Sequence, residues 1–320
     1  MGLSLVRRVG TTVFVAGAVA GLTTGCSDST SAHTSLNTAR ASLLQADAAL
    51  SAVTVKNGIP AGFITGFADS GIYLESGPGI PVGVSAIRAL LTAEYSGPGY
   101  SLAWQPYFAD VSAHADVGYT YGVGTQVYPP SDPSAGTYPL LYLAFWRKIG
   151  GTWKLEAWLT SLDSPGSPAG TAPTGPFATP VTTSLPSFPS DGRAADRQSV
   201  LGTDAEFSDA SVYSGQPLSF TNYADSLGIQ MFADYVYGRQ AISAAYAGTP
   251  LTTVLSWVPA HADVATSNDL AFSVGKYVFF SAIGNTTASF AYGKYMTVWK
   301  HEADGTWRYL NDGGAVSPTP

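Results

Sequence analysis

Apolar residues first recur with the spacing of an α-helix. From Ser35 onward, hydrophobic side chains follow one another at steps of three and four residues, as on the buried face of a helix, at Ala39, Leu43, Leu44, Leu50 and Val53. Gly58 predicts the end of this helix, and Pro60 suits the first turn of a second helix over residues 60–69. The pattern predicts a third helix over residues 84–95, which a Gly-Pro-Gly sequence terminates.

The pattern then changes to that of β-strands. Val117, Tyr119 and Tyr121 alternate with smaller or more polar residues, which is the period of a strand. Residues 138–148 are apolar at nearly every position, and a Gly-Gly turn leads from them into a strand over residues 152–160. A strand that is apolar on both faces must be covered on both faces. We therefore expect helices on one face of this sheet and a second sheet on the other.

Residues 164–192 separate two similar halves of the chain. Seven prolines lie among small and polar residues there, which predicts an extended linker. Beyond it, the sequence LSWVPAHADV matches the earlier LAWQPYFADV, and Trp104 aligns with Trp257 at an offset of 257 − 104 = 153 residues. The first helix recurs as well, with Asp204 at the position of Asp47. The repeat predicts two copies of one α+β domain, residues 35–163 and 193–316.

The first 26 residues have the features of an export signal. Arg7 and Arg8 precede an apolar run over residues 11–22, and small residues lead to Cys26, the only cysteine. This segment resembles a bacterial lipoprotein signal peptide, although Thr23 occupies the position where leucine is usual. The resemblance implies that Cys26 is acylated and becomes the mature N-terminus, with residues 27–34 as a polar tether. The alternative is an ordinary signal peptide in which Cys26 is incidental. Either way we expect an extracytoplasmic protein; the first also implies a lipid anchor in the bacterial cell envelope, on the periplasmic side or the cell surface.

Composition excludes several classes of partner. The chain has 320 residues, 45% of them hydrophobic and only 12% charged, and its net charge is −7. Such a chain offers no basic surface to a phosphate backbone, so we expect no nucleic-acid partner. The four histidines have no metal-ligand spacing and no phosphate-binding glycine loop occurs, so we predict neither a metal nor a cofactor.

Local sequences in the second copy resemble a known family. They include Tyr-Ala-Asp at residues 223–225, Gly-Arg-Gln-Ala-Ile at 238–242 and Tyr-Met-Thr-Val-Trp at 295–299. They resemble the SnoaL-like family, and more narrowly the group catalogued as domain of unknown function 4440 (DUF4440), within the nuclear-transport-factor-two-like (NTF2-like) superfamily. The resemblance implies an α+β fold of two tandem cone-shaped, cystatin-like domains, each with three helices packed on a curved antiparallel sheet and a pocket at its open end. Members include isomerases, cyclases and hydrolases as well as non-enzymatic modules, and fold alone does not choose among them.

Two carboxylates are weak catalytic candidates. Glu75 falls near the position of the catalytic base in the isomerases of that superfamily, and Asp312, which aligns with Trp158, stands where a residue can reach the pocket mouth. The other polar groups of those isomerases are missing, so a rim carboxylate is the alternative for Glu75. Lys294 would give the second pocket a polar anchor if it points inward beside Asp312. The alternative for Lys294 is a solvated lysine on an edge strand.

The remaining predicted pocket residues are aromatic. We expect ring surface in the two pockets from Trp104, Tyr119, Tyr142, Trp158, Trp257 and Tyr295. Asp47 and Asp204 lie on otherwise apolar helix faces, where a buried carboxylate either marks a site or is hydrogen-bonded for structural reasons. Because both copies have this aspartate, we favour a structural role.

These observations lead to three hypotheses about function. The first is a membrane-anchored extracytoplasmic protein that binds a small hydrophobic molecule or acts as an accessory module without catalysis. The second is a SnoaL-like isomerase, cyclase or hydrolase acting on a hydrophobic ring, which a buried carboxylate beside a second polar group would favour. The third is a structural interaction module, which closed cones would favour. In each case we expect the two domains to form an intrachain pseudo-dimer, with Phe145 at the contact between the sheets.

Overall fold

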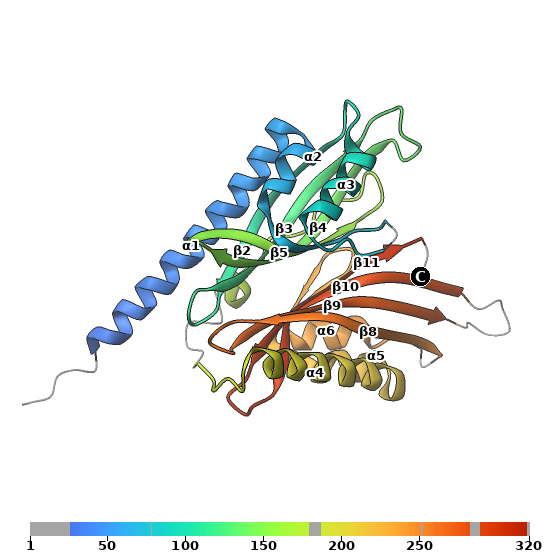
Figure 1. Cartoon of the computed structure of the whole chain (residues 1–320). Helices are drawn as coiled ribbons and strands as arrows, with labels where there is room; N and C mark the ends of the chain where they lie inside the picture. Colours follow the sequence, from blue (N-terminus) through green and yellow to red (C-terminus); the bar gives the residue numbers. More distant parts are fainter. Residues whose placement is uncertain (1–25, 78, 179–186, 251, 282–288, 319–320) are drawn as a thin grey trace, which may run out of the picture.

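The computed structural model describes residues 26–77, 79–178, 187–250, 252–281 and 289–318 (Figure 1). Residues 1–25 of the expected signal peptide lie outside this range. Within it, no helix is both long enough and apolar enough to cross a membrane.

The first half of the chain forms a five-stranded sheet with helices on one face. Its elements are α1 (Cys26–Asn57), α2 (Ile59–Gly62), the 3-10 helix η1 (Phe63–Gly66), β1 (Phe67–Leu74), α3 (Val84–Tyr95), β2 (Ser101–Val111), β3 (Val117–Tyr128), β4 (Gly136–Ile149) and β5 (Thr152–Leu162). The strand order is β1-β5-β4-β3-β2, in which β2 to β5 are joined as antiparallel hairpins and β1 pairs parallel to β5.

Two expectations for this half need correction. The second helix, α2, ends at Gly62, the 3-10 helix η1 continues to Gly66, and Phe67 begins strand β1. The four-residue spacing of Phe63 and Phe67 is real, since their ring centroids lie 5.1 Å apart in one core, but it joins a 3-10 turn to a strand. The residues expected to form a tether, 27–34, belong to the continuous helix α1.

The second half repeats this arrangement. After the short 3-10 helix η2 (Gly175–Ala178) come α4 (Arg193–Ser214), α5 (Gln216–Tyr223), β6 (Ala224–Met231), β7 (Tyr235–Tyr237), α6 (Arg239–Tyr246), β8 (Thr253–Val264), β9 (Leu270–Ser281), β10 (Ser289–His301) and β11 (Trp307–Ser317). The strand order is β7-β6-β11-β10-β9-β8. Both halves therefore have the expected α+β, cystatin-like fold, a curved sheet with helices on its inner face.

The same buried aspartate joins helix to sheet in both halves. Asp47 of α1 accepts hydrogen bonds from the indole Nε1 of Trp104 and from the hydroxyl of Tyr142, the latter at 2.7 Å. In the second half, Asp204 of α4 accepts the equivalent bonds from Trp257 and Tyr295, both at 2.7 Å. Burial raises the pKa of each aspartate to about 6, against the opposing effect of these hydrogen bonds.

The two sheets face each other through their outer surfaces (Figure 1). One core cluster mixes buried side chains from both halves, and the rings of Phe145 on β4 and Phe272 on β9 lie 4.6 Å apart. Strand β4 is thus apolar on both faces because helices cover one face and the second sheet covers the other.

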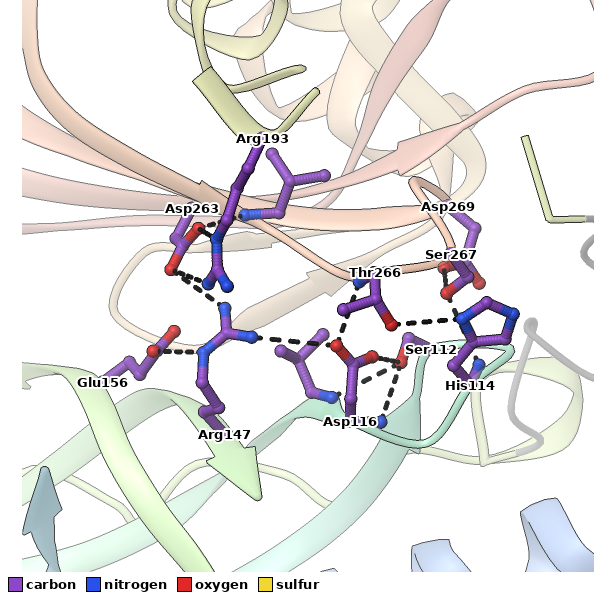
Figure 2. A network of polar contacts seen from close by, with 12 residues as sticks. Ser112, His114, Asp116, Arg147, Glu156, Arg193, Asp263, Thr266, Ser267 and Asp269 are labelled. Atoms are coloured by element: carbon purple, nitrogen blue, oxygen red, sulfur yellow. Dashed lines mark hydrogen bonds and ion pairs between the residues drawn. The ribbon is translucent and has the colours of Figure 1, made fainter. Parts of the chain in front are cut away.

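Two turns make reciprocal contacts at one edge of this interface. The backbone N–H of Ala113 donates to Asp269 at 2.7 Å. The backbone N–H of Thr266 donates to Asp116 at 2.9 Å (Figure 2). Residues 113 and 266, like residues 116 and 269, occupy equivalent positions of the two copies at the 153-residue offset. Such reciprocity is the property of an isologous two-fold interface.

Asp263 of β8 binds three arginines, and one of them, Arg147, belongs to the other half of the chain. It accepts hydrogen bonds from Arg147 of the first sheet at 2.9 Å and from Arg193 and Arg197 of α4 at 2.7 and 2.9 Å (Figure 2 labels the first two). Burial alone would raise the pKa of Asp263, but the hydrogen bonds from Arg193 and Arg197 and the charge of Arg147 outweigh it and lower that pKa well below its usual range.

Replacing Asp263 by alanine is expected to lower the free energy of unfolding by about 2–4 kcal/mol, because Arg147 is largely buried and would lose a charged partner. The side chains of Arg193 and Arg197 are 47% and 38% exposed, so water solvates these two arginines and compensates for much of the ion pairing that they lose with Asp263. Urea denaturation at pH 7 measures the effect, with Asp209→Ala on the exposed face of α4 as the matched control. Since the pKa of Asp263 is lowered by folding, its contribution is present above about pH 4 and is lost as the pH falls below that value. An equal effect of both variants would contradict a role for Asp263 in joining the halves.

Candidate functional site

The second half encloses a cavity of about 360 Å³ between its helices and the inner face of its sheet. The walls are mostly aromatic and apolar, and they include Phe220, Phe232, Tyr246, Leu255, Trp257, Tyr277, Phe279 and Tyr295. The polar lining side chains are Gln216, Gln230 and Asp312 together with the tyrosine hydroxyls. A mostly apolar cavity of this size with a few polar groups is typical of a small-molecule site.

The cavity exists because a tryptophan of the first copy is replaced by an aspartate in the second. In the first half, the indole of Trp158 lies flat on the ring of Tyr142, with centroids 4.5 Å apart and an angle of 6° between the planes. The equivalent of Trp158 is Asp312, and the equivalent of Tyr142 is Tyr295. The ring of Tyr295 is therefore not covered by an indole and lines the open space instead.

Glycines shape the wall beyond Asp312. A Cβ atom on Gly313 would come within 2.5 Å of the Met231 sulfur, and one on Gly293 would come within 2.2 Å of the Tyr277 ring. Both side chains lie against these glycines and line the cavity or its edge. The glycines of β10 and β11 therefore allow Met231 and Tyr277 to lie close against the sheet.

Asp312 is the polar centre of this cavity. It accepts hydrogen bonds from the hydroxyl of Thr297 and, at 2.8 Å, from the Nε2 atom of Gln230. Burial raises the pKa of Asp312 to about 6, although these two hydrogen bonds lower it in part. The carbonyl oxygen Oε1 of Gln230 is buried and has no hydrogen-bond partner among the described residues. The site therefore offers a carboxylate and an unused amide oxygen to a donor on a ligand.

A carboxylate with this pKa has two chemical uses. At neutral pH it is largely ionised, so it can accept a hydrogen bond from a bound molecule. Because its pKa is close to neutrality, it can also take a proton from a weakly acidic carbon–hydrogen bond and return it. The hydroxyl of Tyr295 donates a hydrogen bond to Asp204 at 2.7 Å, and this bond fixes the orientation of the tyrosine ring in the cavity wall.

The predicted site residues of the second half separate into two groups. Trp257, Tyr295 and Asp312 all line the cavity. Lys294 does not, and it is also not a solvated lysine on an edge strand, because β10 lies between β9 and β11. Its side chain is buried on the opposite face of the sheet, where its ammonium group donates to the backbone carbonyls of Glu75, at 2.8 Å, and Gly77 in the first half.

Among the predicted pocket residues of the first half, the four aromatic ones do not line the cavity at the mouth of the first cone. Trp104, Tyr142 and Trp158 pack on one another and on Phe63 in a closed core. Tyr119 lies on the other face of its sheet, in the cluster shared with the second half. The expected pocket positions for these four rings are therefore corrected: three fill the interior of the cone and one belongs to the interface.

Glu75 does border a separate cavity at the mouth of the first cone. The hydroxyls of Tyr73 and Tyr95 donate to its Oε2 atom at 2.9 and 3.0 Å. Burial and the neighbouring Glu94 raise the pKa of Glu75 to about 8. This carboxyl group is therefore largely protonated at pH 7.

Sequence reasoning missed Gln230, Tyr246 and Tyr277 as cavity residues. The alignment of the copies contained a signal for Gln230, because it places Gln230 at the position of Tyr73 just as it places Asp312 at the position of Trp158. In the structure, Tyr73 pairs with Trp158 across β1 and β5. Gln230 pairs with Asp312 across β6 and β11. A neighbouring pair of large rings in one copy is thus replaced by a hydrogen-bonded polar pair in the other. In the described part of the chain, no group of three or more histidine, cysteine or acidic side chains is arranged to hold a metal ion.

No protein-family profile matches the chain, and no curated protein sequence does. Solved structures do resemble it. An NTF2-like protein with a cystatin-like fold from Novosphingobium aromaticivorans is 20% identical, with a TM-score of 0.33, and the match covers 38% of this chain and 82% of that protein. A ketosteroid isomerase-like protein from Erwinia carotovora atroseptica is 14% identical, with a TM-score of 0.33, over 38% of this chain and 95% of that one.

The association domain of C. elegans CaMKII is a further similar structure, 14% identical with a TM-score of 0.33, over 39% of this chain and 99% of that domain. Each match covers about the length of one half of this chain. The solved structures that resemble this chain include NTF2-like proteins with a cystatin-like fold.

Proposed function

We propose that the second half of the chain binds a small, largely apolar molecule that carries at least one hydrogen-bond donor. The observation that carries this proposal is an aromatic cavity in which Asp312 accepts a hydrogen bond from Nε2 of Gln230, while Oε1 of the same glutamine has no partner among the described residues. The apolar walls favour a ring or hydrocarbon body, and the two oxygens fix its orientation. An open cavity also favours ligand binding over a purely structural module.

N-phenyl-1-naphthylamine is a suitable probe, because it is neutral, has two ring systems and one N–H donor, and fluoresces strongly in apolar surroundings. We expect residues 27–320 to bind it saturably. Ala291→Trp, on the cavity wall, should abolish binding, and Asp312→Leu should weaken it about tenfold or more through the loss of a charged acceptor. Val258→Trp, at a position that is 71% exposed, is the matched control and should bind normally. Normal binding by the Ala291→Trp variant would contradict the proposed site.

A second candidate function is proton transfer by Asp312 on a carbonyl compound. The specific observation in its favour is a buried carboxylate with a pKa of about 6 beside two hydrogen-bond donors, Thr297 and Gln230. Loss of deuterium from an α-deuterated cyclic ketone would measure this activity. The rate should rise with pH through about 6 and then level off, because the base must be ionised, and Asp312→Asn should abolish it. A rate independent of Asp312 would contradict this function.

We also propose that the protein is extracytoplasmic and anchored by a lipid on Cys26. The support comes from the charged, apolar and small-residue segments that precede this cysteine. Helix α1 runs without a break from Cys26 to Asn57, and its first part extends beyond the sheet (Figure 1). It would therefore act as a stiff stalk between the membrane and the domains. Cys26→Ser should prevent labelling by radioactive palmitate and release the protein from the membrane fraction. A variant that is still labelled and still found in the membrane fraction would contradict the anchor.

A further inference from the structure

The first half has a cavity of its own, of about 480 Å³, at the open end of its cone. It lies between the end of β1, helix α3 and strands β2, β3 and β5. Its chemistry differs from that of the cavity in the second half. The lining includes three acidic residues, Glu75, Glu94 and Asp132, an amide from Gln126, and several tyrosines.

Two buried polar side chains at this cavity have hydrogen-bonding groups close to its lining. Nε2 of Gln126 has no hydrogen-bond partner among the described residues, and the carboxyl group of Glu75 shares a hydrogen bond with the acidic Glu94. The two residues are 8% exposed for Glu75 and 6% exposed for Gln126. A buried polar atom without a partner costs about 1–3 kcal/mol, so such atoms are rare unless a ligand or water completes them. The amide nitrogen requires an acceptor, whereas the carboxyl oxygen can accept a hydrogen bond or, when protonated, donate one.

The charges at this cavity exclude anionic ligands. Its lining contains acidic side chains and neither lysine nor arginine. The ammonium group of Lys294 lies behind the Glu75–Gly77 segment and bonds to backbone carbonyls. A purely cationic ligand such as an ammonium ion would suit the acidic lining but would leave the Gln126 donor without an acceptor. A group that donates to the acidic side chains and also accepts from Gln126 fits both, and a hydroxyl group does this.

Tyrosine rings form the remaining wall. Tyr95 and Tyr100 have ring centroids 5.7 Å apart, and Tyr128 lies within 6.2 Å of both. Such rings provide flat apolar surface beside the polar groups. We propose that this cavity binds a neutral polyhydroxylated ligand of the saccharide class, with its hydroxyls on Glu75 and Gln126 and its carbon–hydrogen faces against the tyrosines.

The comparison of the two copies supports a divergence in ligand class. Glu75 corresponds to Phe232 at the 157-residue offset, and Gln126 corresponds to Phe279 at the 153-residue offset. Both phenylalanines line the cavity of the second half. The two positions that carry the polar side chains Glu75 and Gln126 in the first cone are thus both phenyl groups in the second. The saccharide proposal does not depend on the apolar ligand proposed for the second half.

The test is saturation-transfer NMR on the full chain in a detergent that contains no sugar. The probes are glucose, galactose, N-acetylglucosamine, maltose, glycerol and tetramethylammonium. We expect saturable binding of at least one of the four saccharides, weakened about tenfold by Gln126→Met, which keeps the length of the side chain. Gln105→Met, at an exposed position of β2, is the matched control. Ala291→Trp, in the other cavity, should also leave saccharide binding unchanged.

A second variant keeps the test valid if Gln126→Met does not fold. Glu75→Gln keeps the shape of the side chain and should also weaken saccharide binding, with native circular dichroism. The proposal is overturned if none of the four saccharides binds saturably, if only glycerol or tetramethylammonium binds, or if Gln126→Met and Glu75→Gln both bind as the wild type does. Loss of N-phenyl-1-naphthylamine binding in Ala291→Trp with intact saccharide binding would separate the two sites.

Discussion

Replacing Phe145 by alanine is expected to lower the free energy of unfolding by about 3–5 kcal/mol. The side chain of Phe145 is fully buried between the two sheets, and its ring lies 4.6 Å from that of Phe272. Truncation would remove apolar contacts with both sheets and leave a cavity that packed strands cannot close easily. Urea denaturation measures the loss. Phe290→Ala, at a position that is 59% exposed, is the matched control and should cost less than about 1 kcal/mol.

A charge at the same position tests the relation of the two halves directly. Phe145→Asp would place an ionised group in an apolar interface without a partner, which is more costly than a cavity. We expect the halves to separate at least in part, with a larger hydrodynamic radius at neutral pH. We propose that the two halves act as an intrachain pseudo-dimer, as their reciprocal turn contacts suggest. An unchanged radius and unchanged stability would overturn this proposal.

Sequence periodicity predicted the long elements well. The third helix was expected over residues 84–95 and is α3 (Val84–Tyr95), and the doubly apolar strand is β4. The prediction was wrong where local spacing and tertiary structure disagree. Phe63 and Phe67 have helical spacing, but Phe67 begins the strand that pairs with β5. That pairing is a long-range contact, which no local pattern contains.

The candidate site was harder to predict, because a strand places neighbouring residues on opposite faces. Lys294 and Tyr295 are adjacent, yet Tyr295 lines the cavity while Lys294 reaches the first half of the chain. Tyr119 likewise faces the second sheet. An error of one residue in the assumed register exchanges the two faces, and in strands apolar on both sides the sequence does not fix that register. Asp312 was identified from the family resemblance, which implies that a residue near this place, at the end of the last strand, can reach the pocket mouth.

Replacing Asp47 by alanine is expected to lower the free energy of unfolding by about 2–5 kcal/mol, because it would leave two buried donors, the indole of Trp104 and the hydroxyl of Tyr142, without an acceptor. Asp47→Asn is the matched control, since its amide keeps the shape and one acceptor oxygen and should cost less. Asp204→Ala should have a similar effect in the second half, through Trp257 and Tyr295. If Asp47→Ala and Asp47→Asn are equally stable, the hydrogen bonds do not account for the presence of this aspartate in both copies.

The pH dependence of these variants separates hydrogen bonding from charge. Burial raises the pKa of Asp47 from 3.8 to about 6 on folding. The contribution of this group to stability is therefore greatest below about pH 4 and is lost as the pH rises through about 6, by an amount on the order of 3 kcal/mol. Other buried carboxyl groups titrate in the same range, so the quantity to measure is the difference in unfolding free energy between wild type and Asp47→Asn. Because asparagine does not ionise, this difference should shift by about 1.4 kcal/mol in favour of the variant between pH 5 and pH 8. A difference independent of pH would mean that Asp47 is not buried as a carboxyl group at the junction of α1 and the sheet.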